Sequence, residues 1–195
     1  VRIKICGLCR AQDVELALEL GADAVGFILE PTSPRYLTNQ VLARLLERVT
    51  AGVERTAVFG NYRPVDGSLG FNRIQSIDRP ASLLPWTAAA RVRQDGWQDI
   101  VVPESADRIL LDAHSDGQYG GTGKTLDWGE SAAFVRSCHL PVVLAGGLNP
   151  DNVATAIELV RPAWVDVSSG IESAPGVKDP ARMRAFVEAA RAART

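Results

Sequence analysis

The sequence has few of the residues that form disulfides or metal sites: three Cys and two His among 195 residues. An odd number of cysteines does not complete a disulfide framework and is typical of a reducing compartment, so we expect a cytoplasmic protein. Two scattered His residues and three Cys residues form no convincing zinc ligand set. A chain of this length can be stabilised by its apolar core alone, and we expect one domain over residues 1–195.

Neither sign of charge dominates, and no long apolar run is present. The 21 Lys and Arg residues nearly balance the 23 Asp and Glu residues. A sequence-independent nucleic-acid binder needs a basic face, so we expect no nucleic-acid partner. The longest uncharged run, Ser137–Pro150, is too short to cross a bilayer. The sequence shown does not open with the basic and then apolar segments of a signal peptide, so we expect no membrane association. A small molecule is the expected partner.

What the sequence does contain is a regular alternation of strand-like and helix-like segments. Eight short apolar runs are typical of parallel strands that are covered on both faces. We predict strands at Val1–Cys6, Ala24–Leu29, Arg55–Gly60, Asn72–Ile77, Ala89–Arg93, Arg108–Asp112, Pro141–Ala145 and Trp164–Ser168. We predict helices at Asp13–Leu20, Asn39–Val49, Asp127–Cys138, Asn152–Val160 and Pro180–Ala193. Thr38 and Asp179 are the candidate N-caps of two of these helices.

Eight such units in one domain favour a small α/β protein of the (β/α)₈ (TIM) barrel type, with an open doubly wound sheet as the alternative. The segment Asn61–Gly70 contains Pro64 and two Gly residues, so we expect a truncated third helix and a barrel wall that is exposed or reshaped there. The connections Arg79–Thr87 and Gly96–Ser105 could each hold a turn or two of helix.

The first strand ends on a candidate catalytic thiol. Alternation along a strand places Lys4 and Cys6 on one face and Ile3 with Ile5 on the other, so Cys6 is expected in the barrel lumen at the catalytic end. The charge of Lys4 could raise the thiolate fraction of Cys6. Cys6 could instead be a small buried apolar residue, and the spacing Cys6-x-x-Cys9 leaves a redox pair as a weaker alternative.

Two further side chains are expected at the same rim. Asp112 ends the sixth strand, where it could act chemically or simply order a loop. Arg35 lies in a proline-stiffened loop after the second strand, and could bind a carboxylate in bidentate fashion or lie exposed in solvent.

Glycine-rich loops follow the last two predicted strands and indicate a phosphate site, because glycine lets backbone N–H groups approach an anion. The predicted phosphate-binding residues are Gly146, Gly147, Ser168, Ser169 and Gly170. A third glycine-rich segment lacks the spacing of a P-loop and is interpreted as a lid at the barrel mouth. The lid glycines are Gly120, Gly121 and Gly123.

Taken in order along the chain, these segments resemble the phosphoribosylanthranilate isomerase family of tryptophan biosynthesis. The matching stretches are Lys4–Leu8, Gly26-Phe27, Ser33–Tyr36, Leu110–Asp112, Gly120–Thr125 with Asp127-Trp128, Leu144–Leu148 with Pro150, and Asp166–Glu172. The resemblance implies a (β/α)₈ barrel without cofactor or metal. It also implies an Amadori rearrangement of N-(5-phosphoribosyl)anthranilate to the 1-deoxyribulose 5-phosphate.

The resemblance also implies individual roles. Cys6 matches the general base and Asp112 the general acid, while Arg35 and Asp166 match substrate-binding positions and Arg35 lies near the anthranilate carboxylate. A general acid must hold its proton near neutral pH, so we expect burial or nearby negative charge, from a Cys6 thiolate or the substrate, to raise the pKa of Asp112. We expect a monomer.

Two departures from the family pattern leave alternatives open. The family usually has Gln-Leu-His-Gly where this chain has Gln75-Ser76-Ile77-Asp78, and Thr or Ser where it has Cys9. One alternative is therefore a barrel that binds phosphosugars without turnover or with altered specificity. Another is an isomerase of the histidine pathway, or a relative that serves both pathways, although such barrels resemble duplicated half-barrels with a carboxylate in the place of Cys6.

Overall fold

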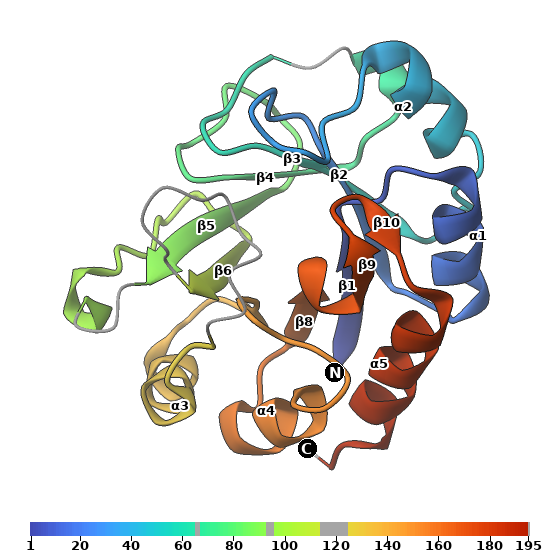
Figure 1. Cartoon of the computed structure of the whole chain (residues 1–195). Coiled ribbons are helices and arrows are strands. Elements are labelled where there is room, and N and C mark those ends of the chain that lie inside the picture. Colours follow the sequence, from blue (N-terminus) through green and yellow to red (C-terminus); the bar gives the residue numbers. More distant parts are fainter. Residues whose placement is uncertain (65–66, 93–95, 114–124, 195) are drawn as a thin grey trace.

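Eight parallel strands form a closed barrel (Figure 1) in a computed structural model that describes residues 1–64, 67–92, 96–113 and 125–194. Each strand pairs with the next along the chain, and β8 pairs with β1 to close the ring. The strands are β1 (Arg2–Cys6), β2 (Ala24–Ile28), β3 (Glu54–Val58), β4 (Arg73–Ser76), β5 (Trp86–Val92), β6 (Arg108–Ala113), β7 (Val142–Leu144) and β8 (Trp164–Val167). The predicted (β/α)₈ barrel is confirmed, because an open sheet would leave β1 and β8 unpaired with each other.

Within the residues that the structure describes, five α-helices pack around the barrel, each at a predicted position. They are α1 (Ala11–Glu19), α2 (Asn39–Leu46), α3 (Trp128–Ser137), α4 (Val153–Val160) and α5 (Pro180–Ala192). Asp179 caps α5 by accepting from the backbone N–H groups of Ala181 and Arg182, whereas the Thr38 side chain makes no capping bond to α2. In the described part of the chain, no helix has the length and apolar character needed to cross a membrane.

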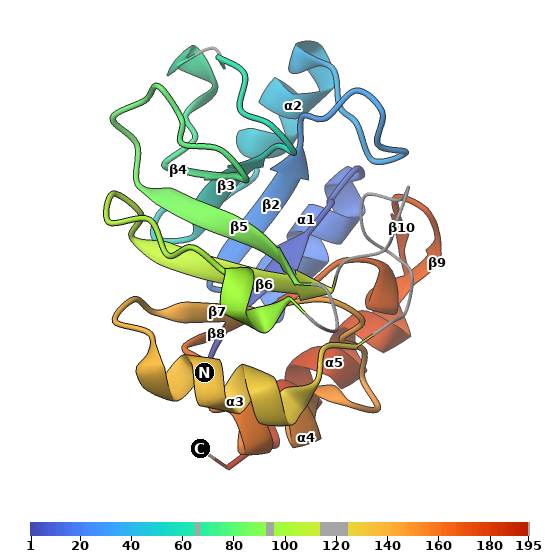
Figure 2. The same cartoon turned by 90° about the vertical axis from the view of Figure 1, so that its left-hand side faces the viewer.

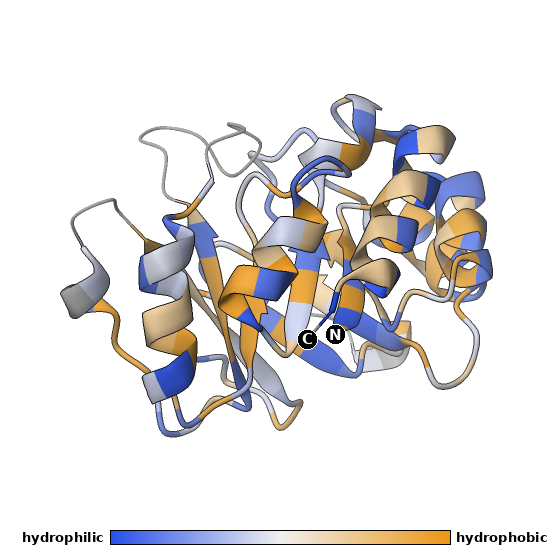
Figure 3. Ribbon diagram, turned by 90° about the horizontal axis from the view of Figure 1, so that it is seen from below, coloured by the Kyte–Doolittle hydropathy of each residue, from blue (hydrophilic) through white to orange (hydrophobic). Residues whose placement is uncertain are grey.

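The last helix returns to the start of the chain. Arg191 of α5 donates a hydrogen bond to the carbonyl of Val1 at 3.3 Å, and Figures 1, 2 and 3 all place the two termini next to each other. The same arginine contacts Asp23, which precedes β2, at 3.1 Å. Helix α5 therefore covers the seam where β1 meets β8.

The side of the barrel around β4 and β5 is bordered by short connections. Among the described residues, the β3–β4 connection holds only the 3₁₀ turn η1 (Gly67–Leu69), and the β5–β6 connection only η2 (Trp97–Asp99). Residues 77–85, between β4 and β5, contain no helix. This agrees with the expected truncation of the third helix, and Figure 1 shows loops where helices flank the other strands.

Strand β5 begins earlier than expected. Trp86 and Thr87, assigned by sequence to a connection, are the first residues of β5, three positions before the predicted start at Ala89. The alanines that follow have low strand propensity, so this start could not be recognised from the residue pattern. Pairing decides it, because Trp86 is in register with Ile74 of β4 and Thr87 with Arg108 of β6.

Of the two expected outcomes, an exposed or a reshaped barrel wall, the structure shows the second at the centre of this wall. Ile74, Trp86 and Ala88 are buried, and the Trp86 indole donates to the carbonyl of Ser76 at 3.3 Å. Apolar side chains of the connections pack on the same core. They are Leu69, Phe71, Leu84, Trp97 and Ile100. Apolar residues of the connections, two of them aromatic, thus cover the surface that helices cover elsewhere.

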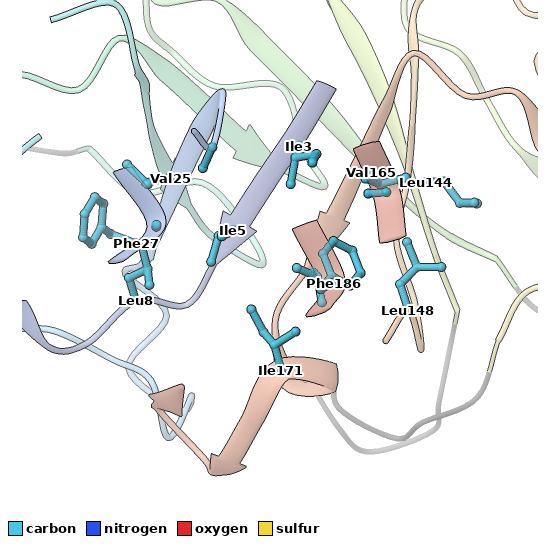
Figure 4. Packing of buried hydrophobic residues seen from close by; sticks show 14 of the residues in the cluster. Ile3, Ile5, Leu8, Val25, Phe27, Leu144, Leu148, Val165, Ile171 and Phe186 are labelled. Atoms are coloured by element: carbon cyan, nitrogen blue, oxygen red, sulfur yellow. The ribbon is translucent and has the colours of Figure 1, made fainter. Parts of the chain in front are cut away.

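The core has an outer layer between strands and helices and an inner layer in the lumen. Ile3 and Ile5 of β1 lie in the outer layer with Phe186 of α5 (Figure 4), whereas Lys4 and Cys6 point inward, as alternation predicted. The apolar lumen residues are Ala24, Leu110, Val143, Ala145 and Trp164.

Charged residues fill the lumen at the N-terminal end of the strands. Glu54 accepts from Arg73 and Arg108, each at 2.8 Å, and the Arg108 guanidinium lies 4.1 Å from the centre of the Trp164 ring. This paired cluster occupies one end of the lumen. The cavity described below opens at the other end.

An antiparallel hairpin that the sequence did not predict follows β8. It consists of η3 (Ser169–Ile171), β9 (Glu172–Ala174) and β10 (Val177–Lys178), and Figure 2 shows it on the side of the barrel where the strands end. Glu172 and Lys178, at its two ends, are both buried. The hairpin therefore carries charged side chains into the interior.

The two helix caps give a matched test of the fold. Replacing Asp179 with Ala removes the acceptor of two N–H groups and should cost about 1 kcal/mol of unfolding free energy in urea titrations. Replacing Thr38 with Ala removes no capping bond and should cost less than about 0.5 kcal/mol. Equal losses in the two variants would contradict this assignment of the caps.

Candidate active site

The chemically active residues predicted from the sequence line one cavity. Its volume is about 160 Å³, and it lies at the C-terminal end of the barrel strands. Cys6, Arg35, Asp112 and Asp166 contribute side chains to its wall. The predicted phosphate residues complete the same wall: Gly146, Gly147, Ser168, Ser169 and Gly170. The candidate lid glycines Gly120, Gly121 and Gly123 lie outside the described residues.

A buried ion pair joins the first and last strands beside the cavity. Lys4 is in register with Asp166, and its Nζ lies 2.9 Å from Asp166 Oδ2. Burial alone would lower the pKa of Lys4, but the charges of Asp166 and Cys6 raise it above the usual lysine value, so Lys4 is a cation. The other oxygen of Asp166, Oδ1, is buried and has no hydrogen-bond partner among the described residues.

Cys6 and Lys4 share a contact with the bare backbone of β2. A methyl group built at Gly26 would lie 2.8 Å from Cys6 Sγ and 3.1 Å from Lys4 Nζ, so both side chains occupy space that a Cβ would need. Burial raises the pKa of the Cys6 thiol above its usual value, and the charge of Lys4 offsets only part of this rise. The expected gain in thiolate from Lys4 is therefore outweighed by desolvation in the empty cavity.

Asp112 has the raised pKa that a general acid requires. Burial is the largest cause, followed by the charge of Asp166, and together they raise the pKa of Asp112 to about 6 against the opposing charge of Arg91. The raised pKa is thus confirmed, but the negative neighbour in this structure is Asp166 and not the expected Cys6 thiolate. A carboxyl with a pKa of about 6 is roughly one-tenth protonated at pH 7.

The glycines of the predicted phosphate loops are there for steric reasons. Gly146 has a φ of +79°, and a Cβ there would lie 2.5 Å from the backbone nitrogen of Ala113. A Cβ at Gly170 would lie 1.9 Å from the carbonyl oxygen of Leu148. Only glycine permits these approaches of one backbone segment to another, and both glycines also line the cavity.

Arg35 reaches the cavity but already has a carboxylate partner. Its Nε and one Nη donate to the two oxygens of Glu172, at 2.8 and 2.6 Å. This pair uses the Nε edge of the guanidinium, so a contact of Arg35 with a substrate carboxylate would have to use the remaining Nη1 side. Glu172 in turn contacts Lys178 Nζ at 2.8 Å.

Sequence reasoning missed Glu172 and Lys178 as members of the site. Glu172 was visible only as the last residue of a matching stretch, and Lys178 gave no signal. Among the residues that the structure describes, no group of three or more His, Cys, Asp and Glu side chains converges as a metal site would require.

Comparison with known proteins agrees with this geometry. The family model of N-(5'-phosphoribosyl)anthranilate (PRA) isomerase matches residues 86–189. N-(5'-phosphoribosyl)anthranilate isomerase of Chromohalobacter salexigens is 43% identical, over 95% of this chain and 92% of its own. The corresponding protein of Geobacter sulfurreducens is 38% identical, over 98% of both chains. The chain belongs to the phosphoribosylanthranilate isomerase family.

Solved structures of the family superpose closely on this barrel. The Thermotoga maritima phosphoribosylanthranilate isomerase has a TM-score of 0.85 at 34% identity, with 98% of each chain covered. A phosphoribosylanthranilate isomerase structure in complex with reduced 1-(o-carboxyphenylamino)-1-deoxyribulose 5-phosphate has a TM-score of 0.81 at 31% identity, also with 98% of each chain covered.

The departures from the family pattern have structural consequences. Ile77, where the family usually has His, lines the cavity together with Gln75 and adds an apolar surface. Asp78 accepts from the backbone N–H of Tyr62 at 2.6 Å and so links the loops after β3 and β4. Cys9 directs its thiol to the carbonyls of Gly7 and Arg35, each at 3.6 Å, and does not line the cavity.

The close packing at Gly26 gives a stability prediction. A Gly26→Ala variant must displace Cys6 and Lys4 and should lose about 1–3 kcal/mol of unfolding free energy. Gly67→Ala is the control, because a Cβ at Gly67 meets no atom of the described residues within 4 Å. Urea unfolding of both variants measures the difference. Equal stabilities would show that β2 has room for a side chain beside the thiol.

The pKa of Asp112 predicts a pH dependence of stability. The folded protein holds this proton more tightly than the unfolded chain, because the pKa rises from 3.8 to about 6 on folding. The resulting stabilisation is present below pH 4 and is lost as the pH rises through 6. The unfolding free energy of the wild type, minus that of Asp112→Asn, should fall between pH 4 and 7 by on the order of 1–2 kcal/mol. A flat or rising difference would contradict the raised pKa.

Proposed function

We propose that the chain converts N-(5'-phosphoribosyl)anthranilate to 1-(2-carboxyphenylamino)-1-deoxyribulose 5-phosphate, as a cytoplasmic enzyme of tryptophan biosynthesis. The observation that carries the proposal is that Cys6 of β1 and Asp112 of β6 line the same cavity, beside glycine loops suited to phosphate. Membership of the isomerase family supports the substrate. Every group in the proposed site comes from one chain, so we propose that a monomer suffices.

The rearrangement needs one proton delivered and one removed. Asp112 protonates the furanose ring oxygen, the C1'–O bond breaks, and the lone pair of the anthranilate nitrogen forms a protonated imine. The Cys6 thiolate then removes the proton from C2', and the C–H electron pair moves toward the imine to give an enolamine. Tautomerisation of the enolamine yields the ketose.

In the empty site, Asp112 and Cys6 are rarely both in the ionisation state that the reaction needs. Asp112 has a pKa of about 6, whereas burial raises the pKa of Cys6, so few molecules hold a protonated acid and a thiolate together. Bound substrate shifts both groups in the productive direction. Its negative charges raise the pKa of Asp112, and the protonated imine favours the thiolate.

Other cavity residues suit the remaining parts of the substrate. The phosphate lies against Gly146, Gly147 and residues 168–170. Asp166, which lines the cavity, accepts a hydrogen bond from a sugar hydroxyl. The anthranilate ring lies against the apolar wall formed by Ile28, Val58, Phe59 and Ile77. Its carboxylate approaches Arg35 from the side that Glu172 does not occupy.

Loss of either reacting group should abolish most of the activity. Cys6→Ala and Asp112→Asn should each lower kcat about 10²–10⁴-fold, the usual contribution of a general acid or base. Cys138→Ala is the matched control, because this free cysteine lies after α3 and does not line the cavity. Complementation of a tryptophan auxotroph by the wild type, but not by Cys6→Ala, is the corresponding test in cells.

Two results would contradict the proposal, and a third would extend it to a second substrate. Near-normal turnover by Cys6→Ala or Asp112→Asn would reject the assigned roles. A wild-type protein that binds the product but has no turnover would be a phosphosugar-binding barrel. Turnover of the histidine-pathway aminoaldose as well would indicate an isomerase that serves both pathways.

A further inference from the structure

We propose that Glu172 and Lys178 are positioning residues that hold the phosphate loop and Arg35 at a fixed spacing, so that the two anionic ends of one substrate bind together. The inference rests on the proposed function, because it takes the phosphate and the anthranilate carboxylate as the two ends. Both residues belong to the β9–β10 hairpin, which has no part in the proton transfers.

Lys178 acts through Ser168 and not on the ligand directly. Its side chain is buried, and its Nζ donates to Ser168 O at 2.9 Å, to Ser168 Oγ at 3.4 Å and to Glu172 Oε1 at 2.8 Å. An ammonium group has three protons, so these contacts use all of its donors. Lys178 therefore fixes the phosphate loop at Ser168 and adds a positive charge next to this residue.

Glu172 is shared by two cations. Its Oε1 accepts from Arg35 Nε and Lys178 Nζ, and its Oε2 accepts from Arg35 Nη2 at 2.6 Å. Burial works to raise the pKa of Glu172, but the hydrogen bonds from Arg35 and the charge of Lys178 hold it below the usual value. The Arg35–Glu172–Lys178 triad thus has a net charge of +1. Holding that charge in the interior is costly, and a bound anion offsets the cost.

Arg35 and Ser168, the residue that Lys178 contacts, lie close together in space. A Cβ built at Gly7 would lie 2.7 Å from Arg35 Cδ and 2.8 Å from Ser168 Oγ, so the loops after β1, β2 and β8 meet at this glycine. Gly7 has a φ of +70°, which also favours glycine. A shift of the phosphate loop would therefore displace the Arg35 side chain.

Helix α1 and helix α5 hold the hairpin in place. Asp13 of α1 accepts from the Lys178 backbone N–H at 3.3 Å, and Arg10 donates to the Lys178 carbonyl at 2.8 Å. Arg182 of α5 donates to the Glu172 carbonyl at 2.9 Å. With both ends of the hairpin anchored, the triad has a fixed geometry before any ligand arrives, which lowers the ordering cost of binding.

The proposal predicts opposite binding defects in two single variants. Lys178→Met should raise the Kd for inorganic phosphate at least ~10-fold and change the Kd for anthranilate less than ~2-fold, as expected for loss of one charged hydrogen-bond donor. Glu172→Gln removes the charged partner that positions Arg35. It should raise the Kd for anthranilate at least ~10-fold without raising the Kd for inorganic phosphate. Isothermal titration calorimetry with the two probes separately measures all four constants.

Kinetics and a control separate positioning from a purely structural role. With N-(5'-phosphoribosyl)anthranilate, both variants should raise KM about tenfold or more and leave kcat within ~3-fold, because neither residue touches the reacting atoms. Ser173→Ala is the control, because Ser173 lies in the same hairpin and, among the described residues, its hydroxyl hydrogen-bonds to the Val177 carbonyl alone, at 3.4 Å. It should leave both Kd values unchanged.

Several results would overturn the inference. One is a folded variant in which the affinities for phosphate and anthranilate fall equally, or in which neither falls. Another is a Ser173→Ala control with the same binding defect. The last is a wild-type protein that binds no inorganic phosphate. If Lys178→Met does not fold, Glu172→Gln/Lys178→Met is compared with Glu172→Gln, and only a further loss of phosphate affinity supports the inference. A wild type that binds both probes without turnover refutes the proposed function, while the dissociation constants still decide the role of the triad.

Discussion

The ion pair between Lys4 and Asp166 is the interaction on which the barrel and its cavity both depend. It joins β1 to β8, the two strands whose pairing closes the ring, at a N–O distance of 2.9 Å inside the lumen. Removing one partner would leave an unpaired buried charge, which costs far more than the pair itself contributes. The same two side chains set the electrostatics of the site, because Lys4 lies beside Cys6 and Asp166 raises the pKa of Asp112.

Close backbone approach is the second constraint on the site. Gly7, Gly26, Gly146 and Gly170 each lie where a Cβ would meet another atom of the cavity wall at less than 3 Å. These contacts bring the loops after β1, β2, β6, β7 and β8 together around one opening. The thiol, the carboxyl and the candidate phosphate loops therefore converge because glycine lets the strand ends approach one another.

The helices are distributed unevenly around the barrel. In the described residues, the connections around β4 and β5 contain no α-helix, and apolar residues of these connections cover that wall. The residues proposed to carry the chemistry come from both parts of the barrel. Cys6 of β1 and Asp166 of β8 lie on strands beside the helices α1 and α5, whereas Asp112 lies on β6, which pairs with β5 of the helix-free wall (Figure 1).

The closed barrel, its five helices and the lumen position of Cys6 could all be predicted from the sequence. Each depends on local patterns: apolar runs, alternation along a strand, and caps such as Asp179. The start of β5 could not be predicted, because register with β4 and β6 decides it where alanines give a weak signal.

The charged contacts of the site were also beyond prediction. The Arg35–Glu172 pair spans 137 residues and the Lys4–Asp166 pair 162 residues along the chain. The sequence by itself determined which residue types reach the barrel rim. Only the tertiary structure decided which of these residues form ion pairs or shift each other's pKa values, because both depend on distances between segments that lie far apart along the chain.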